Sequence, residues 1–322
     1  MSNNVIFLAA GGSGGHVFPA QALAEVLLQR GWDVFLITDR RGLEFTRGFS
    51  EKVEKIVLKV KNPSSGGIYS FVLSIWLLFW SVIAVIRFCR KLQPSFVIGF
   101  GGYPSAPSMV AAQILKIPSV IHEQNAVLGR VNRIFRKRVK FLAFGLTPYL
   151  STDCTENVII SGNPVRKFIL ESNRKKFTNN SPGKFKILVL GGSQGASLVS
   201  ELVCEAIIKL PEKIRKRVSV IHQCRKDDIR NIEEKYSCSS VDSMTKAFFE
   251  NVFEHFNAAN LVISRAGAST LAELCIFGRP SILIPLPTAV GNHQALNAGV
   301  MEAEGAPIVM DQTKLTAKKL TE

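Results

Sequence analysis

A strand-like apolar run, a glycine-rich loop and a helical pattern follow one another twice in this chain. The first copy is Val5–Ala10 with GGSGGH at 11–16, and the second is Lys186–Leu190 with GGSQGA at 191–196 and a helix over Ser197–Lys209. Apolar strands that alternate with helices form parallel sheets covered on both faces. The repeat, offset by 180 residues, predicts an α/β fold of two Rossmann-like, doubly wound domains that face each other across a ligand-binding cleft.

Other strand-like runs fill the intervals between the two loops and beyond. They are Val34–Thr38, Phe96–Phe100, Ser119–His122, Phe141–Phe144, Val158–Ser161, 218–222, 261–264 and 281–285. Gly162-Asn163-Pro164 is a natural hinge, because proline interrupts both ladders and helices. A length of 322 residues suits two domains at about 150 residues each. We expect an N-terminal domain over 1–163 and a C-terminal domain over 164–322.

The charge balance favours an acidic partner. Forty basic residues against 25 acidic ones give a net charge of +15, which suits a phosphorylated substrate, an anionic membrane or a nucleic acid. The six cysteines are scattered, so a disulfide framework or a structural zinc site is not expected, and a reducing cytoplasm fits. The N-terminal apolar segment is short and is not preceded by basic residues, so it predicts a first strand and not a signal peptide.

One uncharged segment, 62–86, allows three interpretations. Its part Phe71–Ile86 is almost wholly apolar and long enough to span a bilayer, with basic residues on both sides. It could also be a buried core helix, or a helix that docks its apolar face onto a membrane surface. Spanning would separate two segments of one predicted sheet, so docking is favoured. The basic run 130–140 suits a nucleic acid or an anionic lipid, and lipid is favoured because no nucleic-acid motif accompanies it.

Polar residues that follow predicted strands are the candidate site. His16 begins the first helix, beside free N–H groups that can bind an anion. The run His122-Glu123-Gln124-Asn125 closes a strand; it begins like a zinc motif, but Ala126 stands where the second histidine belongs, so no metal is expected. Arg265 follows another strand, before a helix that carries Ser269, Thr270 and Glu273. Enzymes that hold a nucleotide-sugar through a divalent metal often use an Asp-x-Asp pair, and none occurs in this sequence. For such a ligand, backbone N–H groups and Arg265 would have to stabilise the leaving diphosphate instead. The alternatives for these residues are helix capping and surface loops.

Six motifs together resemble one family, the MurG transferases of bacteria. They are GGSGGHVFPA (11–20), GFGGYPSAP (99–107), HEQN (122–125), GNPVR (162–166), GGSQGA (191–196) and SRAGASTLAEL (264–274). The resemblance implies a GT-B fold and an inverting transfer of N-acetylglucosamine (GlcNAc) from its UDP donor. The acceptor would be the MurNAc 4-hydroxyl of lipid I, undecaprenyl-diphospho-MurNAc-pentapeptide, and the product lipid II of peptidoglycan. It also implies a peripheral enzyme on the cytoplasmic face of the inner membrane, with other cell-wall and division proteins as partners, and neither cofactor nor nucleic acid.

The resemblance also assigns site residues. Those for UDP-GlcNAc are Ser13, Gly14, Gly15, Asn125, Arg166, Ser193, Phe249, Arg265, Ala268, Ser269, Thr270, Leu271, Ala272, Glu273 and Gln294. Those on the acceptor side are Tyr103, His122, Asn62, Gly66 and Gly67, with 71–86 facing the membrane. Inversion needs a base at the acceptor hydroxyl. His16 is favoured because imidazole titrates near neutrality, and Glu123 is the rival.

Three other functions stay open. One is a homologue, short of its final C-terminal helix, that binds UDP-sugar without efficient turnover. Another keeps the fold and takes a different acceptor. The last is a basic nucleic-acid-binding protein, which would bind in a salt-sensitive way and ignore UDP-sugar.

Overall fold

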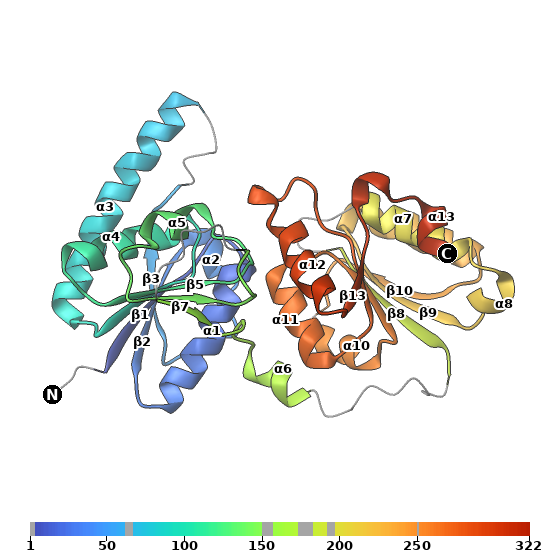
Figure 1. Ribbon diagram of the computed structural model, residues 1–322, viewed down its shortest axis with the longest axis horizontal. Helices are drawn as coiled ribbons and strands as arrows, with labels where there is room; N and C mark the ends of the chain where they lie inside the picture. Colours follow the sequence, from blue (N-terminus) through green and yellow to red (C-terminus); the bar gives the residue numbers. More distant parts are fainter. Residues whose placement is uncertain (1–3, 62–66, 150–156, 173–182, 192–196, 250) are drawn as a thin grey trace. The chain divides into compact units, whose positions relative to one another are not determined.

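The computed structural model describes residues 4–61, 67–149, 157–172, 183–191, 197–249 and 251–322. The chain divides into two compact units, Met1–Lys167 and Phe168–Glu322. Each unit has its own parallel sheet with helices packed against it (Figure 1). The prediction of two doubly wound α/β units is confirmed.

In the first unit, the described residues form a seven-stranded parallel sheet in the order β3-β2-β1-β4-β5-β6-β7. Its strands are β1 (Val5–Ala9), β2 (Asp33–Asp39), β3 (Glu54–Leu58), β4 (Phe96–Gly99), β5 (Ser119–Glu123), β6 (Phe141–Phe144) and β7 (Val158–Ile160). Its helices are α1 (Gly14–Gln29), α2 (Arg40–Leu43), α3 (Ile68–Leu92), the 3-10 turn η1 (Tyr103–Ser105), α4 (Ala106–Ile114) and α5 (Arg130–Phe135).

Strand β1 explains why both faces of this sheet are covered. All five of its residues are buried. Val5 and Phe7 belong to one core cluster, which includes residues of α3 and α4, while Ile6 and Leu8 belong to another with residues of α1. Because successive side chains of a strand point to opposite faces, a continuous apolar run needs a partner layer on each side.

In the second unit, the described residues form a six-stranded parallel sheet in the order β10-β9-β8-β11-β12-β13. Its strands are β8 (Phe185–Leu190), β9 (Val218–Gln223), β10 (Asp242–Lys246), β11 (Leu261–Ser264), β12 (Ser281–Leu283) and β13 (Pro307–Val309). Its α-helices are α7 (Ser197–Ile208), α8 (Glu212–Arg215), α9 (Ile229–Cys238), α10 (Val252–Ala258), α11 (Ala268–Phe277), α12 (His293–Ala303) and α13 (Ala317–Thr321). The 3-10 turns are η2 (Lys226–Asp228), η3 (Val290–Asn292) and η4 (Gln312–Lys314), and α6 (Lys167–Ser172) begins at the division between the units.

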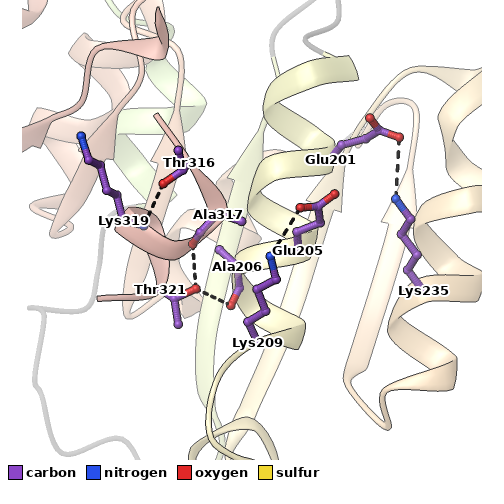
Figure 2. A network of polar contacts seen from close by, with 9 residues as sticks. All are labelled: Glu201, Glu205, Ala206, Lys209, Lys235, Thr316, Ala317, Lys319 and Thr321. Atoms are coloured by element: carbon purple, nitrogen blue, oxygen red, sulfur yellow. Dashed lines mark hydrogen bonds and ion pairs between the residues drawn. The ribbon is translucent and has the colours of Figure 1, made fainter. Parts of the chain in front are cut away.

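The last helix is attached to α7. The Thr321 hydroxyl donates a hydrogen bond to the carbonyl of Ala206 at 3.1 Å, and Thr316 caps the helix by accepting from the backbone N–H of Lys319 (Figure 2). Exposed ion pairs on the same side, such as Lys209 with Glu205, contribute little to stability. The Thr321 hydroxyl also lies 2.8 Å from the carbonyl of Ala317 in its own helix, and Leu320 packs against the core cluster that includes α7, so apolar packing and this shared hydroxyl together attach α13.

Three strands were not predicted from the sequence, namely β3, β10 and β13. Each lies at an edge of its sheet. Edge strands are half exposed, so their residues (EKIVL and DSMTK in the first two cases) do not form a continuous apolar run. The central strands lie within one or two residues of their predicted limits.

Helix α3 is an exposed apolar helix over much of its length. Among the described residues it is the one helix long and apolar enough to cross a membrane, and only 17% of its most apolar 18-residue window is buried. Figure 1 shows the N-terminal half of α3 extending beyond the sheet of its own unit. The alternative of a fully buried core helix is therefore wrong.

Candidate functional site

Both sheets have a topological switch point at which the chain changes direction across the sheet. In the first unit it lies between β1 and β4, since β2 and β3 lie on one side and β5 to β7 on the other. Loops that leave the carboxyl ends of such neighbouring strands diverge to opposite faces and leave a crevice where ligands bind. The loop after β1 holds the first glycine motif, and the loop after β4 holds Gly101, Gly102 and Tyr103.

Asp39, at the carboxyl end of β2, connects these two loops. Its buried carboxylate accepts hydrogen bonds from the backbone N–H of Gly12 at 2.8 Å and from that of Gly42 at 2.9 Å. The Tyr103 hydroxyl donates to the same carboxylate at 2.7 Å. Burial and the bond to Asp39 raise the pKa of Tyr103 to about 12, so the phenol stays protonated as a donor. Asp39 is not among the residues predicted from the sequence, although a lone carboxylate at the end of the apolar strand β2 was an available signal.

His16, Gln124 and His122 form one hydrogen-bonded series. Nδ1 of His16 lies 3.0 Å from Oε1 of Gln124, and Nε2 of Gln124 lies 3.2 Å from Nδ1 of His122. Nε2 of His122 lies 3.2 Å from the carbonyl of Gly162. Burial lowers the pKa of His122, so that ring is neutral at pH 7. Both ring nitrogens of His122 are thus engaged inside the protein, whereas His16 is only partly buried.

Glu123 is held by four hydrogen bonds. Oε1 accepts from the backbone N–H and the side-chain amide of Asn125 at 3.2 and 3.0 Å. Oε2 accepts from the backbone N–H of Gly129 and the amide of Asn132, both at 2.8 Å. The carboxylate is buried and fixes the loop that leads into α5. Asn132, on α5, was not selected from the sequence.

Gly101 and Gly102 allow the loop after β4 to approach His16. Both have positive φ, +87° and +72°, a region that side-chain-bearing residues rarely adopt. A Cβ atom on Gly102 would lie 3.3 Å from Nε2 of His16, and one on Gly101 would lie 3.4 Å from its Cε1. The imidazole therefore packs against bare backbone at the switch point.

In the second unit the switch point lies between β8 and β11. The loop after β11 leads into α11, whose N-cap residue Gly267 offers no side-chain cap. The first N–H groups of a helix have no intrahelical partner and attract anions. The buried Oγ of Ser269, in the first turn, also has no hydrogen-bond partner within the described part of the chain. This helix end therefore has the unpaired donors that an anion-binding position needs.

Arg265 and Gln294 support the loop after β12. Nη1 of Arg265 donates to the carbonyls of Ile284 and Pro285 at 2.9 and 3.2 Å, and burial lowers the pKa of its guanidinium. Oε1 of Gln294, on α12, accepts from the backbone N–H of Leu286 at 2.9 Å. The buried amide of Asn297, one turn further along α12 and not selected from the sequence, donates to the carbonyl of Ala266 at 3.2 Å. These bonds hold the loops after β11 and β12 in place beside α11.

The remaining predicted residues divide between the units. Ser13, Gly14 and Gly15 lie at the start of α1, where Ser13 makes no side-chain cap. The Arg166 guanidinium lies 4.3 Å from the centroid of the Phe18 ring. On α11, Ala268 and Leu271 are buried, while Thr270, Ala272 and Glu273 are partly exposed. The buried Phe249 ring packs edge-on against His255 at 4.7 Å, which leaves its backbone for any ligand contact.

Three predicted residues, Asn62, Gly66 and Ser193, lie outside the described residues. Gly67 is described and precedes α3 as its N-cap. Among the described side chains, no group of three or more His, Cys, Asp and Glu residues is placed to hold a metal ion.

An apolar cavity of about 490 Å³ lies away from all of these residues, against α7, α13 and the sheet of the second unit. Its lining includes Val203, Ile207, Ile263 and Leu320. It contains none of the predicted site residues, so the polar carboxyl edges of the two sheets are the candidate site.

Comparisons with known proteins cover nearly the whole chain. The N-terminal domain of glycosyltransferase family 28 matches residues 6–143, and the C-terminal domain of that family matches residues 186–322. Two relatives carry the name UDP-N-acetylglucosamine--N-acetylmuramyl-(pentapeptide) pyrophosphoryl-undecaprenol N-acetylglucosamine transferase. The one from Agrobacterium fabrum is 40% identical over 100% of this chain and 85% of its own. The one from Paramagnetospirillum magneticum is 42% identical over 98% of this chain and 86% of its own.

Solved structures agree with the fold. The crystal structure of Acinetobacter baumannii MurG has a TM-score of 0.75 at 26% identity and covers 98% of this chain and 88% of its own. The glycosyltransferase of kitacinnamycin has a TM-score of 0.69 at 15% identity, which concerns the fold alone. The expected GT-B fold is thus confirmed.

Proposed function

The chain belongs to the MurG family within glycosyltransferase family 28, and from this premise we propose that it transfers GlcNAc from UDP-GlcNAc to lipid I and so forms lipid II. The observation that carries the proposal is an identity of about 40% to named transferases along the whole chain. A donor with a diphosphate and an acceptor with a diphospholipid also suit a protein of net charge +15.

Donor binding is assigned to the carboxyl edge of the second unit. The N–H groups at the start of α11, together with the partnerless Ser269 hydroxyl, suit the diphosphate. Glu273 lies further along the same helix, where a carboxylate can accept hydrogen bonds from ribose hydroxyls. Gln294 would read the sugar hydroxyls, and the backbone at Phe249 would read the uracil edge. Donor contacts in the first unit are assigned to Ser13, Gly14, Gly15, Asn125 and Arg166, and on the glycine loop of the second unit to Ser193.

His16 is assigned as the general base. Nε2 of His16 would take the proton of the acceptor 4-hydroxyl while that oxygen attacks the anomeric carbon of GlcNAc. The bond from the anomeric carbon to the diphosphate oxygen breaks in the same displacement, UDP departs with the electron pair, and the configuration inverts. The positive end of α11 would stabilise the charge that develops on UDP.

The surroundings of Glu123 favour His16 over this rival. The carboxylate of Glu123 accepts four hydrogen bonds from the loop that it holds and is buried. Both oxygens of this carboxylate are thus occupied by donors of the loop from Asn125 to Asn132, which leaves neither of them directed to a substrate hydroxyl. We therefore assign Glu123 to fixing the loop before α5, and Tyr103, His122 and Gly67 to the acceptor side of the first unit.

Helix α3 supports a peripheral location on the cytoplasmic face of the membrane. Its outward residues include Phe71, Trp76, Phe79 and Trp80, which are 49 to 57% exposed. Its buried residues at the same end are serines, and Ser74 donates to the carbonyl of Ser70 at 2.7 Å. A helix with small polar residues inside and aromatic residues outside has its apolar face turned to a nonpolar phase. The basic run 130–140 would add attraction to anionic lipid.

The test is transfer itself. The purified chain is incubated with radiolabelled UDP-GlcNAc and a short-chain lipid I analogue, once in EDTA and once in Mg²⁺, and label is counted in the lipid product. Label is expected in both, because no Asp-x-Asp pair is present to hold the donor through a metal. The His16→Gln variant should bind UDP normally and lose about 10²- to 10⁴-fold in rate. Donor binding without transfer by the unaltered chain would instead favour a homologue without turnover, and an absence of UDP binding would contradict the donor site.

A further inference from the structure

The series of hydrogen bonds from Gly162 to His16 determines where each proton lies. A carbonyl can only accept, so Nε2 of His122, at 3.2 Å from the carbonyl of Gly162, must carry the hydrogen of that ring. His122 is neutral because burial lowers its pKa, and its Nδ1 therefore has the lone pair.

The orientation of the Gln124 amide follows from this. Its NH₂ group lies 3.2 Å from two acceptors of His122, namely Nδ1 and the main-chain carbonyl oxygen. A flipped amide would place its oxygen against both acceptors, which is repulsive. The amide nitrogen therefore faces His122 and Oε1 faces Nδ1 of His16 at 3.0 Å.

The same step fixes the tautomer of His16. An amide oxygen only accepts, so Nδ1 of His16 must carry the hydrogen in that bond. In neutral His16, Nε2 then has the lone pair that a general base needs. Free histidine prefers the other tautomer, with the hydrogen on Nε2, so this outcome depends on the protein.

Burial and contacts with neighbouring residues restrict the position of Gln124. Gln124 is 2% exposed, and its main-chain carbonyl accepts from the side-chain amide of Asn163 at 3.0 Å. The ring of His122, to which it donates, packs against Phe100 with centroids 5.6 Å apart. A buried amide that lost its partners would be costly, so the arrangement has little freedom.

We propose that Gln124 is a positioning residue that holds His16 in the Nδ1–H tautomer and so presents the Nε2 lone pair to the acceptor hydroxyl. The catalytic part of this inference rests on the proposed function, whereas the tautomer does not. Gln124 acts through His16, and it has no assigned contact with either substrate.

The first measurement is the tautomer, read from long-range ¹H–¹⁵N correlations of the ¹⁵N-histidine-labelled chain. The chain has five histidines, and the His16 signals are assigned by their loss in His16→Gln. The unaltered protein should show Nδ1–H at His16 and Nε2–H at His122. His16 with its hydrogen on Nε2 would overturn the proposal, whether or not the chain transfers GlcNAc.

The second measurement uses Gln124→Met, which keeps the volume and removes all three hydrogen bonds of the side chain, one to His16 and two to His122. The Nδ1–H signal of His16 should give way to Nε2–H, and kcat should fall roughly 100-fold with little change in KM for UDP-GlcNAc. Gln113→Met is the matched control, since the Gln113 amide also donates to one carbonyl, that of Arg138, and one side chain, that of Ser119. It should leave both the His16 tautomer and kcat unchanged.

A third variant keeps the proposal testable if Gln124→Met fails to fold. Gln124→Glu retains an oxygen opposite Nδ1 of His16, while its second oxygen faces the two acceptors of His122 and needs a proton, carried either by the carboxyl group or by Nδ1 of His122. It should keep the His16 tautomer and retain more kcat than Gln124→Met.

Normal kcat in Gln124→Met with an altered tautomer would show that the tautomer does not control the reaction. A correct tautomer in a chain that never transfers would contradict the proposed function alone.

Discussion

Glycines at the carboxyl edge of the first sheet allow contacts that no other residue would. Gly102 combines a φ of +72° with a position where a Cβ atom would press on the His16 ring. Gly31, after α1, has almost the same φ, +77°, but nothing lies within 4 Å of its would-be Cβ. Substitution of Gly31 therefore tests backbone strain alone, whereas substitution of Gly102 tests backbone strain together with crowding of His16.

Gly102→Ala should impair both stability and catalysis, while Gly31→Ala should impair stability alone. Each substitution introduces a left-handed alanine, at a cost of about 1 to 2 kcal/mol. Only Gly102→Ala also displaces the imidazole, so its kcat should fall at least tenfold. All three tryptophans lie in the first unit, so urea unfolding followed by tryptophan fluorescence reports its stability. Equal kcat in the two variants would show that His16 tolerates the displacement.

At the scale of elements, α3 departs from the pattern of a water-soluble helix. Its inward face holds Ser70, Ser74 and Ser81, and the hydroxyl of Ser81 donates to the carbonyl of Lys59 at 3.2 Å. Its C-terminal part is apolar inside, with Val85 and Cys89 in the core. The helix thus anchors in the unit at one end and presents an aromatic face at the other.

The double variant Trp76→Gln/Phe79→Gln should weaken binding to vesicles of anionic lipid by roughly tenfold per residue, because each side chain loses its transfer into the membrane. Co-sedimentation with phosphatidylglycerol vesicles measures the change. Phe248→Gln is the control, since Phe248 is 72% exposed but lies in the second unit. Equal loss in the control, or no loss in the double variant, would place the membrane contact elsewhere.

At the scale of the whole molecule, each unit has its own core, and the core of the second unit is next to a buried titratable group. In the second unit the fully buried His222 accepts from or donates to the Tyr236 hydroxyl at 3.0 Å through Nδ1. Its Nε2 has no hydrogen-bond partner among the described residues. Burial lowers the pKa of His222 to about 4, because a charged ring there would be unsolvated.

The second unit should therefore lose stability as the pH falls. The unfolded histidine titrates near 6.5 and the folded one near 4, so the unfolded state binds the extra proton within this window. The stabilisation is complete above pH 6.5 and decreases on acidification, by about 3 kcal/mol at most. Hydrogen exchange of β8, β9 and β11 in urea at pH 7, 6 and 5 measures it. His222→Gln should reduce the dependence of the second unit's stability on pH and leave that of the first unit unchanged. If the pH dependence of β8, β9 and β11 were unaltered, groups other than His222 would be responsible for it.

Much of the architecture could be read from the order of residues. Strands buried on both faces appear as continuous apolar runs, so the central strands were predicted, while the half-exposed edge strands β3, β10 and β13 were not. His16 was selected because it begins a helix after a glycine loop, and Glu123 and Arg265 because polar residues at the ends of buried strands are site candidates. Asp39 was missed although it ends an apolar strand, and Asn132 and Asn297 were missed because an asparagine within a helical segment has no local mark of its partner.

Two α/β units, two glycine loops and an apolar segment follow from the order of the residues, since these features depend on local composition and periodicity. Which residues meet depends on the folded chain. A parallel sheet gathers the ends of strands that are far apart in the chain, so Gln124 reaches His16 across 108 residues and Tyr103 reaches Asp39 across 64. Whether a side chain donates or accepts a hydrogen bond depends on the partners that folding brings to it. The roles of Glu123 and Gln124 could therefore be distinguished only in the folded chain.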